Sequence, residues 1–508
     1  MLNTLPTLVV LRSQPLPAEL RFKTGARYPS DLYVTHTMSL GDKIVEEFHR
    51  HYPGAAVLFL EPQNATDCFA TDLEQLVRAV PSGSPVIVTV GDALLVSDHC
   101  WRQSSGSVVF RIRNDSRLLS HTFTVLDDEG RVNHPPLSRL VADPRLAVCG
   151  LWIFETKARL LRLIGRHQDF FEFVADATKS LPTIEVDASD FFDFGHVDSY
   201  SASRLRFSSS RQHHHLEQSP VRVDKTFPTH GEALKHLAWF NGLPPGPRWY
   251  TPRVCMLDGS PRTLSIEYCS SPSVTELLLY RVLSKDNGWL RLAHTLRGFL
   301  SEMMASSAGT TAVSESGWMY LQKTVLRLTE WSRSTVGAAH KDRVKLVLDS
   351  IVRYVEKFGL TKSTVSIIHG DPCFSNLLFD RHSLSLRVID PRGSFFTEDP
   401  SIYGDPAYDV AKLLHSYRFG YDLVLAGRYR RDGSNVDFTV EDQCEMNCAD
   451  AALTPMLESV YGSDVFRRAE AIVPLLFLSM LPLHADDAVR QSTLFEIGFK
   501  EFQCKLSS

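Results

Sequence analysis

Residues 366–390 read SIIHGDPCFSNLLFDRHSLSLRVID, and this stretch decides the fold of the second half of the chain. Its apolar runs, interrupted by turn-forming residues, predict three short strands, at 365–368, 377–379 and 386–389. Asp371 and Asn376 then follow the first strand, and Asp390 ends the third. Two acids and one amide therefore lie at the ends of apolar strands, where packing can hold them rigidly.

These three side chains are the groups that phosphoryl transfer requires. The reaction needs a carboxylate near the acceptor hydroxyl and oxygen ligands that hold Mg²⁺ against the nucleotide phosphates. Asn376 and Asp390 are hard oxygen donors suited to Mg²⁺, while Asp371 can orient and deprotonate a hydroxyl. A His-Gly-Asp turn alone could equally be a polar turn between strands. The interpretation therefore depends on the spacings of five and fourteen residues and on a downstream segment.

The segment resembles the aminoglycoside phosphotransferase and choline kinase superfamily in His369-Gly370-Asp371, Asn376, Ile389-Asp390 and residues 404–413 (GDPAYDVAKL). The resemblance implies an α+β bilobal, protein-kinase-like domain that uses ATP and Mg²⁺ to phosphorylate a hydroxyl of a small molecule. By the same resemblance Asp371 is the catalytic base, and Asn376 and Asp390 are the Mg²⁺ ligands. Asp409 is expected to hold the backbone of the catalytic loop, and His369 to brace that loop.

Such a fold also needs a small lobe with a phosphate-binding lysine. Lys225 ends a strand 146 residues before the proposed base, and we expect it to reach the nucleotide phosphates. The alternative is an exposed lysine on an edge strand. Glu232, which opens the next helix, is the candidate partner of this lysine. Glu267 and Tyr268 lie in the segment 265–271, which we expect to join the lobes and to contact adenine through backbone groups.

Three further features each have two interpretations. The turn at 208–211 (SSSR) would cover the phosphates but lacks the usual glycines. Arg392, which follows the metal aspartate, either binds an anionic substrate or phosphate or braces its loop. Asp486 and Asp487 lie where the superfamily builds its acceptor pocket, and they either meet a cationic or sugar acceptor or cap a helix.

The first two hundred residues alternate strand-length apolar runs with helical stretches, which predicts an α/β domain with a mostly parallel sheet. Continuous apolar runs lie at 7–11, 55–60 and 85–90. Runs at shorter spacing predict added antiparallel strands, at 108–113, 122–126 and 147–154. A shift to Ser, Arg and His at 199–219 places the domain boundary near residue 198. We therefore expect domains at 1–197, 198–270 and 271–508.

The first domain resembles sugar nucleotidyltransferases through its early strand, its parallel core and two aspartates, Asp92 and Asp193. The resemblance implies that both carboxylates bind a metal ion. The loop at 11–17 (LRSQPLP) departs from the pattern of that family. It contains no glycine, so its backbone cannot easily wrap a triphosphate. We interpret the domain as a degenerate relative that binds a nucleotide-sugar or glycan. The tandem arrangement resembles proteins of bacterial capsule and surface-polysaccharide synthesis.

The composition excludes several classes of protein. The 508 residues carry a net charge of −5 without a basic stripe, so we expect no nucleic-acid partner. The nine cysteines contain no Cys-x-x-Cys pair and are typical of reduced, cytoplasmic thiols. The longest apolar run contains two prolines and is too short for a membrane span. The sequence carries no signal for a particular acceptor or oligomeric state.

The leading hypothesis is a cytoplasmic ATP- and Mg²⁺-dependent phosphotransferase that acts on a hydroxyl of a small molecule, in particular a sugar or polysaccharide precursor. One alternative is nucleotidyl transfer at Asp92 and Asp193. The other is a non-catalytic protein that binds a nucleotide or a glycan.

Overall fold

The computed structural model describes most of the chain, namely residues 5–11, 16, 18–24, 26–32, 34, 38–60, 69–101, 106–113, 125–126, 132–133, 146–167, 173, 176–177, 180–187, 190–195, 200, 203–204, 215–219, 221–307, 313–314, 317–361, 363–393 and 401–507. Two compact units divide the chain, Met1–Ser208 and Ser209–Ser508. The predicted domain limits at residues 198 and 271 stay predictions. The predicted phosphate-covering turn at 208–211 lies outside the described residues.

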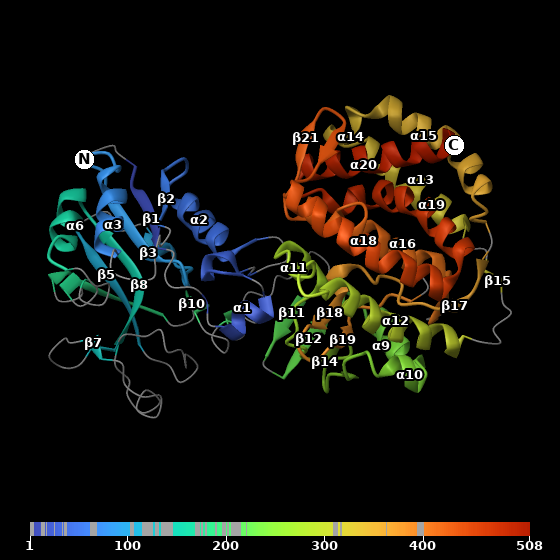
Figure 1. Ribbon diagram of the computed structural model, residues 1–508, viewed down its shortest axis with the longest axis horizontal. Coiled ribbons are helices and arrows are strands. Elements are labelled where there is room, and N and C mark those ends of the chain that lie inside the picture. The colour runs from blue at the N-terminus through green and yellow to red at the C-terminus, as the bar shows by residue number, and fades with distance from the viewer. Residues whose placement is uncertain are drawn as a thin grey trace. The chain divides into compact units, whose positions relative to one another are not determined.

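The N-terminal unit is built on a mixed sheet (Figure 1). Its main strands run in the order β2 (Val57–Leu60), β1 (Thr7–Leu11), β3 (Val86–Val90), β8 (Leu146–Phe154), β5 (Val108–Arg113) and β9 (Thr183–Val186). The first three are parallel to one another, β8 is antiparallel to both of its neighbours, and β9 is parallel to β5. Two short strands extend β8, namely β6 (Val125–Leu126) and β7 (Val132–Asn133). The predicted α/β class is confirmed, including the added antiparallel strands.

Helices connect these parallel strands because a parallel pair needs a crossover. The helices of this unit are α1 (Ala18–Thr24), η1 (Pro29–Asp31), α2 (Leu40–His51), α3 (Phe69–Arg78), α4 (Asp98–Trp101) and α6 (Lys157–Ile164). α2 begins with a capping box, in which the Ser39 hydroxyl accepts a hydrogen bond from the Asp42 N–H at 3.1 Å. A separate two-stranded ribbon pairs β4 (Ala93–Leu95) with β10 (Phe191–Asp193).

The small lobe of the C-terminal unit is a four-stranded antiparallel sheet covered by helices. Its strands run in the order β11 (His215–Gln218), β12 (Arg222–Thr226), β14 (Thr263–Glu267) and β13 (Val254–Met256), and its helices are α9 (His230–Gly242) and α10 (Pro245–Arg248). Ala233 of α9 packs with Phe227 and Leu264 in the lobe's core. The packing places the end of β12, and with it Lys225, inside the lobe rather than at an exposed edge, since only 7% of Lys225 is exposed.

The large lobe is mainly helical. Its long helices are α12 (Gly288–Ser306), α13 (Gly317–Ser332), α15 (Lys341–Lys357), α16 (Pro406–Tyr417), α18 (Val440–Tyr461), α19 (Ser463–Met480) and α20 (Ala488–Ser507). Shorter ones are α11 (Val274–Leu279), α14 (Thr335–Ala338), α17 (Tyr421–Leu425) and η4 (Leu481–His484). α15 ends at Lys357, shortly before Gly359, whose backbone is in the left-handed conformation (φ 61°) that commonly terminates a helix.

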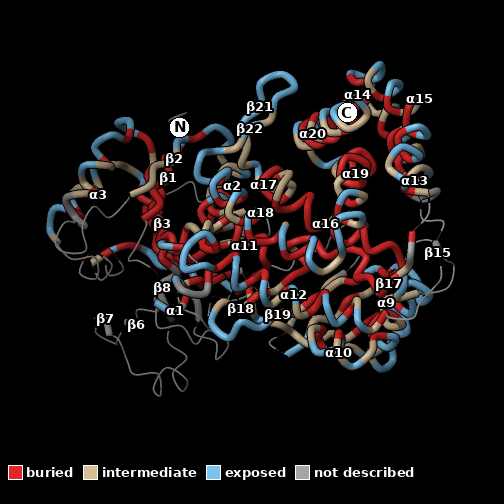
Figure 2. Tube along the Cα trace, turned by 45° about the vertical axis from the view of Figure 1, so that its right-hand side comes forward, coloured by how far each residue is buried: buried red, intermediate tan, exposed pale blue. Residues whose placement is uncertain are grey.

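The longest apolar run of the sequence, at 471–483, forms the second half of α19 and continues into η4, and its residues within α19 are buried (Figure 2). α19 packs against α13, α16 and α20, and this arrangement explains why the run is apolar without a polar face. Within the part of the chain that the structure describes, no helix combines the length and hydropathy that a membrane crossing needs.

The quoted stretch folds as its pattern predicts. β17 (Ser366–Ile367) precedes the His-Gly-Asp turn, η3 (Phe374–Asn376) follows it, and β18 (Leu377–Asp380) and β19 (Ser385–Val388) form a hairpin. Short two-stranded pairs complete the lobe: β17 with β20 (Tyr403–Gly404), β15 (Val313–Ser314) with β16 (Ser363–Thr364), and β21 (Arg430–Asp432) with β22 (Asn435–Asp437).

Candidate active site

A buried carboxylate on α16 fixes the loop that follows β17. Asp405 caps α16 by accepting a hydrogen bond from the Ala407 N–H, and Pro406 occupies the first turn. Asp409 therefore lies in the first turn, where its two carboxylate oxygens accept hydrogen bonds from the N–H groups of His369 (2.7 Å) and Gly370 (2.8 Å). The expected tie between the helix and the loop is confirmed.

His369 supports the same loop. Its side chain is fully buried, and burial lowers its pKa to about 4, so the ring is neutral. Its Nδ1 accepts a hydrogen bond from the Asp371 N–H at 3.3 Å. Its carbonyl accepts hydrogen bonds from the N–H groups of Arg392 (2.8 Å) and Gly393 (3.0 Å), which joins the two loops of the site.

Asp371 is buried between two cations. Lys412 Nζ lies 3.0 Å from one carboxylate oxygen and Arg392 Nε lies 3.4 Å from the other. Burial by itself would raise the pKa of Asp371, but the charges of Lys412 and Arg392 outweigh it and hold the pKa below its ordinary value. Asp371 is therefore an ionised carboxylate.

The amide of Asn376 has a fixed orientation. Its Nδ2 donates a hydrogen bond to the Asp371 carbonyl at 2.9 Å, and its backbone carbonyl accepts one from the Ile389 N–H at 3.0 Å. Because the amide nitrogen is engaged, Oδ1 is the side-chain atom left to act as a ligand.

Asp390 forms an ion pair with Lys225 of the small lobe. Lys225 Nζ lies 2.5 Å from Asp390 Oδ1, and the backbone of Asp390 is in the left-handed region (φ 54°). Burial would raise the pKa of Asp390, but Lys225 and then His236 and Arg392 lower it below its ordinary value. Arg392 interacts with both carboxylates, Asp371 and Asp390. The structure thus brings together four of the residues predicted from the sequence, Asp371, Asn376, Asp390 and Lys225.

The expected pairing of Lys225 with Glu232 is replaced by the pairing with Asp390. Glu232 lies exposed on the first turn of α9, where its N–H donates a hydrogen bond to the Thr229 hydroxyl. One turn later His236 contacts the Phe227 ring (centroids 4.6 Å apart), and its charge acts on Asp390. α9 therefore presents a histidine where the sequence analysis expected an acid.

The segment expected to contact adenine lies at the end of β14. Glu267 accepts a hydrogen bond from the Arg253 N–H at 3.0 Å, and its carboxylate lies 3.3 Å from the Arg253 guanidinium. The pKa of Glu267 is lowered, mainly by the hydrogen bond from the Arg253 N–H and next by the hydrogen bond from the Arg253 side chain. The Tyr268 N–H donates to the Val221 carbonyl at 3.1 Å. The Glu267 side chain and the Tyr268 N–H thus serve the small lobe itself.

Sequence reasoning missed Lys412, which contacts Asp371, and the contact between Lys323 and Tyr408. The signal for Lys412 was present, because it lies three residues after Asp409 in the quoted block and therefore on the same face of α16. Lys323 belongs to α13, and its Nζ donates a hydrogen bond to the hydroxyl of Tyr408 on α16 at 3.1 Å. No sequence pattern indicates that contact.

In the N-terminal unit, Asp92 and Asp193 lie beside each other on the β4–β10 ribbon. Asp193 pairs in register with Ala93, and the Phe194 N–H donates to the Asp92 carbonyl at 2.8 Å. Burial, and after it the charge of Asp193, raises the pKa of Asp92 to about 7. Asp92 Oδ1 is buried without a hydrogen-bond partner. Two adjacent carboxylates, one with an unsatisfied oxygen, fit a divalent cation. Most of the glycine-free loop at 11–17 lies outside the described residues.

Asp486 and Asp487 cap and brace α20. The Arg490 N–H donates to Asp487 Oδ1 at 2.9 Å, and the Arg490 guanidinium lies 2.9 Å from Asp486. This arrangement favours the capping interpretation of the two acids.

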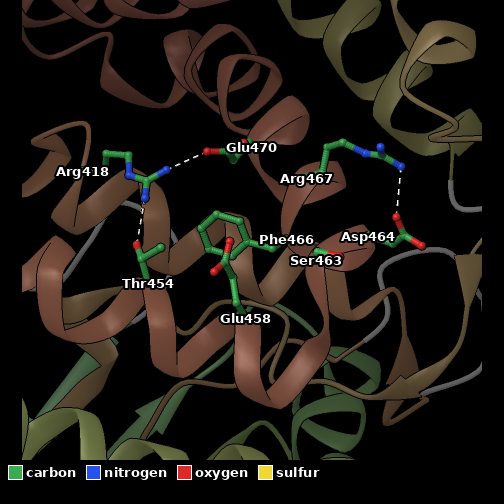
Figure 3. A pocket seen from close by; sticks show the side chains of 8 residues that line it. All are labelled: Arg418, Thr454, Glu458, Ser463, Asp464, Phe466, Arg467 and Glu470. Atoms are coloured by element: carbon green, nitrogen blue, oxygen red, sulfur yellow. Dashed lines mark hydrogen bonds and ion pairs between the residues drawn. The ribbon is translucent and has the colours of Figure 1, made fainter.

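A surface pocket of about 430 Å³ lies on the helical bundle, lined by Arg418, Thr454, Glu458, Ser463, Asp464, Phe466, Arg467 and Glu470 (Figure 3). Its arginines pair with its own acids, Arg418 with Glu470 at 2.7 Å and Arg467 with Asp464 at 3.0 Å. None of the residues predicted from the sequence lines it, so we do not assign the chemistry to this pocket.

Comparisons with known proteins agree with the location of the site. Residues 287–443 match the model of the phosphotransferase enzyme family, and this range includes Asp371, Asn376 and Asp390. No curated protein matches the chain. The match supports phosphotransferase chemistry for this part of the chain.

Solved structures similar to the chain include kinases and a nucleotidyltransferase. A glucosamine kinase is 15% identical, with 55% of this chain and 73% of that chain covered and a TM-score of 0.39. A choline/ethanolamine kinase family protein from Mesorhizobium loti is 12% identical, with 59% and 85% covered and a TM-score of 0.33. The CTP:phosphocholine cytidylyltransferase from Streptococcus pneumoniae is 13% identical, with 39% and 96% covered and a TM-score of 0.29.

The loop geometry predicts that replacing Gly370 by alanine destabilises the fold. Its φ is +82°, and an added Cβ would lie 2.3 Å from the Gly393 carbonyl oxygen. Gly359→Ala is the matched control, because φ there is +61° with nothing within 4 Å of the added Cβ. Both variants pay about 1–2 kcal/mol of backbone strain, and we expect Gly370→Ala to lose a further 1–3 kcal/mol or so by overpacking. Calorimetric unfolding of the full chain measures the difference, and equal transition temperatures would contradict the described loop contact.

Proposed function

We propose that the C-terminal unit transfers the γ-phosphoryl group of ATP to a hydroxyl of a small molecule, with a sugar or polysaccharide precursor as the acceptor class. The observation that carries the proposal is the convergence of Asp371, Asn376 and Asp390 on one site with Lys225. The family match at residues 287–443 supports the same reaction class.

In this proposal Asp371 holds the acceptor hydroxyl. The bond between the γ-phosphorus and the oxygen of ADP breaks, the acceptor oxygen bonds to phosphorus, and the hydroxyl proton passes to the Asp371 carboxylate. A carboxylate with a lowered pKa is a weak base, which suits a loose transition state in which the proton moves late. Orientation of the hydroxyl is then the main contribution of Asp371.

The donor set fits Mg²⁺. Asn376 Oδ1 and the Asp390 carboxylate are hard oxygen ligands, and Asp390 already attracts a cation, since Lys225 lies 2.5 Å away. When bound, Mg²⁺ would neutralise charge on the nucleotide phosphates. We propose that Lys225 binds those phosphates as well.

The remaining predicted nucleotide contacts belong to the same proposal. Glu267 and Tyr268 mark the segment for adenine, where backbone groups of the following residues would make the contact. Glu232 lies exposed at the start of α9, and the lysine that it was expected to position pairs with Asp390 instead. The resemblance of the tandem arrangement to capsule and surface-polysaccharide proteins is the reason to propose a cytoplasmic, bacterial setting.

Removal of the proposed base tests the reaction. Asp371→Ala should lower phosphoryl transfer by roughly 10²- to 10⁴-fold and leave the affinity for ATP within a few-fold of the unmodified chain. Transfer is measured as ADP formed in the presence of a panel of hydroxyl acceptors, and nucleotide affinity by calorimetric titration. Asp349→Ala, which removes an exposed acid from α15, is the control. Undiminished turnover in Asp371→Ala would end the assignment of the base.

The ion pair with Lys412 predicts the pH dependence of transfer. Because the folded pKa of Asp371 is lowered, the carboxylate stays ionised across about pH 5 to 8, and activity should not fall with its protonation there. In Lys412→Met, burial acts against fewer opposing charges, so the pKa of Asp371 rises and the acid limb of kcat/KM moves to higher pH. A profile of unchanged shape in Lys412→Met would show that this ion pair does not control ionisation of Asp371.

The buried pair Asp92 and Asp193 favours nucleotidyl transfer as a second candidate function. If the N-terminal unit carries it, CTP or UTP with a sugar phosphate should release pyrophosphate. That release should vanish in Asp92→Ala and persist in Asp371→Ala. Release that survives in Asp92→Ala would exclude the pair as the site, and no turnover of any nucleotide by the full chain would favour a non-catalytic binding protein.

A further inference from the structure

Lys412 places an ammonium group directly against the proposed base, since its Nζ lies 3.0 Å from Asp371 Oδ1. Lys412 follows Asp409 by three residues on α16, so the two side chains lie on the same side of that helix. Asp409 holds the backbone of His369 and Gly370. α16 therefore supplies both the carboxylate that fixes this turn and a cation that contacts the base.

Neighbours on the same helix fix the position of Lys412. Its Nζ lies 5.9 Å from the centroid of the Tyr408 ring, one turn earlier, and its carbonyl accepts a hydrogen bond from Nδ1 of the buried His415. Burial would lower the pKa of Lys412, but the charge of Asp371 outweighs burial and holds the pKa above its ordinary value. Lys412 is therefore a charged ammonium group with a defined position.

The ammonium group can bind an anion without giving up its contact with Asp371. A lysine ammonium carries three N–H donors and no acceptor, and the contact with Asp371 Oδ1 needs one of these donors. Arg392 contacts the other carboxylate oxygen, 3.4 Å from its Nε. The side chains of Lys412 and Asp371 are 15% and 10% exposed, so a substrate can reach the pair.

The proposed reaction brings the phosphoryl group to this pair. The acceptor hydroxyl hydrogen-bonds to Asp371 while its oxygen approaches the γ-phosphorus to about 3 to 3.5 Å. The oxygens bonded to that phosphorus then lie within reach of an ammonium group that contacts Asp371 Oδ1. Lys225 contacts Asp390, a proposed metal ligand. The two lysines therefore meet the nucleotide complex at different points, and Lys412 is the lysine on the acceptor side.

We propose that Lys412 is a catalytic residue, whose ammonium group donates a hydrogen bond to an oxygen of the γ-phosphoryl group during transfer while it stays in contact with Asp371. The inference rests on the proposed phosphotransferase function. The acceptor oxygen replaces the ADP oxygen on phosphorus, the hydroxyl proton passes to Asp371, and Lys412 keeps its three protons. Its contribution is electrostatic, because the group in transfer carries negative charge on its outer oxygens.

The pH profile of Lys412→Met separates this role from charge compensation of Asp371 alone. ADP formation by the full chain with Mg²⁺ and ATP is measured from about pH 5 to 9, with water alone and with glucose, glucosamine or gluconate as the added acceptor. On the alkaline plateau of the profile Asp371 is ionised in both proteins. We expect kcat there to stay roughly 10²- to 10³-fold lower in Lys412→Met, because a donor to the transition-state charge is missing. With charge compensation alone, kcat on the plateau would equal that of the unmodified chain.

Binding of a transition-state analogue tests the contact without turnover. Aluminium fluoride with Mg²⁺ and ADP mimics the phosphoryl group in transfer, and calorimetric titration of the full chain measures its affinity. Lys412→Met should weaken binding of ADP with aluminium fluoride by roughly tenfold or more, and leave binding of ADP with Mg²⁺ within a few-fold of the unmodified chain. Lys345→Met, which removes an exposed lysine from α15, is the matched control and should change neither affinity.

A second variant keeps the test valid if Lys412→Met does not fold, because Lys412→Met leaves the buried Asp371 with one cation fewer. Lys412→Arg retains the charge, and thermal unfolding of both variants shows which are folded. A guanidinium group is planar and larger than an ammonium group, so it should keep Asp371 ionised without reproducing the position of the ammonium donors. We expect Lys412→Arg to have an unchanged acid limb and a kcat lowered by roughly tenfold or more.

Several results would overturn the inference and leave the proposed function intact, provided that Asp371→Ala still loses transfer. They are a plateau kcat that is restored in Lys412→Met, a full kcat in Lys412→Arg, and an unchanged affinity of Lys412→Met for ADP with aluminium fluoride. An unmodified chain that forms no ADP with any of these acceptors, water included, refutes the phosphotransferase and the inference with it.

Discussion

The carboxylate of Asp409 accepts hydrogen bonds from two consecutive backbone N–H groups, and the rest of the site depends on this contact. It holds the turn of His369 and Gly370, which positions Asp371 and, through one amide hydrogen bond, Asn376. The His369 carbonyl then binds the loop that follows Asp390. A single buried acid on α16 therefore sets the relative positions of the proposed base and both proposed metal ligands.

The buried carboxylates of the two candidate sites have different electrostatic surroundings. Asp371 and Asp390 each have a cation within contact distance, and both remain ionised. Asp92 has Asp193 beside it instead, and its pKa is raised to about 7. The first site is compensated by the protein itself and suits a substrate that brings its own charges. The second places two acids next to each other, and such a pair suits a bound cation.

The parts of the site that sequence alone predicted are local. Asp371 and Asn376 are five residues apart on one turn, so their spacing specifies their geometry. The pairing of Lys225 with Asp390 joins residues 165 apart, and it depends on how the small lobe packs. Sequence reasoning singled out Lys225 and paired it with Glu232, whereas the structure pairs Lys225 with Asp390 and leaves Glu232 exposed. Lys323 was missed because its contact with Tyr408 requires α13 to lie against α16, which no helical pattern specifies.

The central claim is that Asn376 and Asp390 hold the metal of a nucleotide complex while Asp371 faces the acceptor. A crystal structure of the full chain with Mg²⁺ and a non-hydrolysable ATP analogue tests it most directly. The account predicts a cation bound to Asn376 Oδ1 and the Asp390 carboxylate, with Lys225 on the nucleotide phosphates. A nucleotide bound away from these residues, or no metal at Asn376 and Asp390, would contradict it.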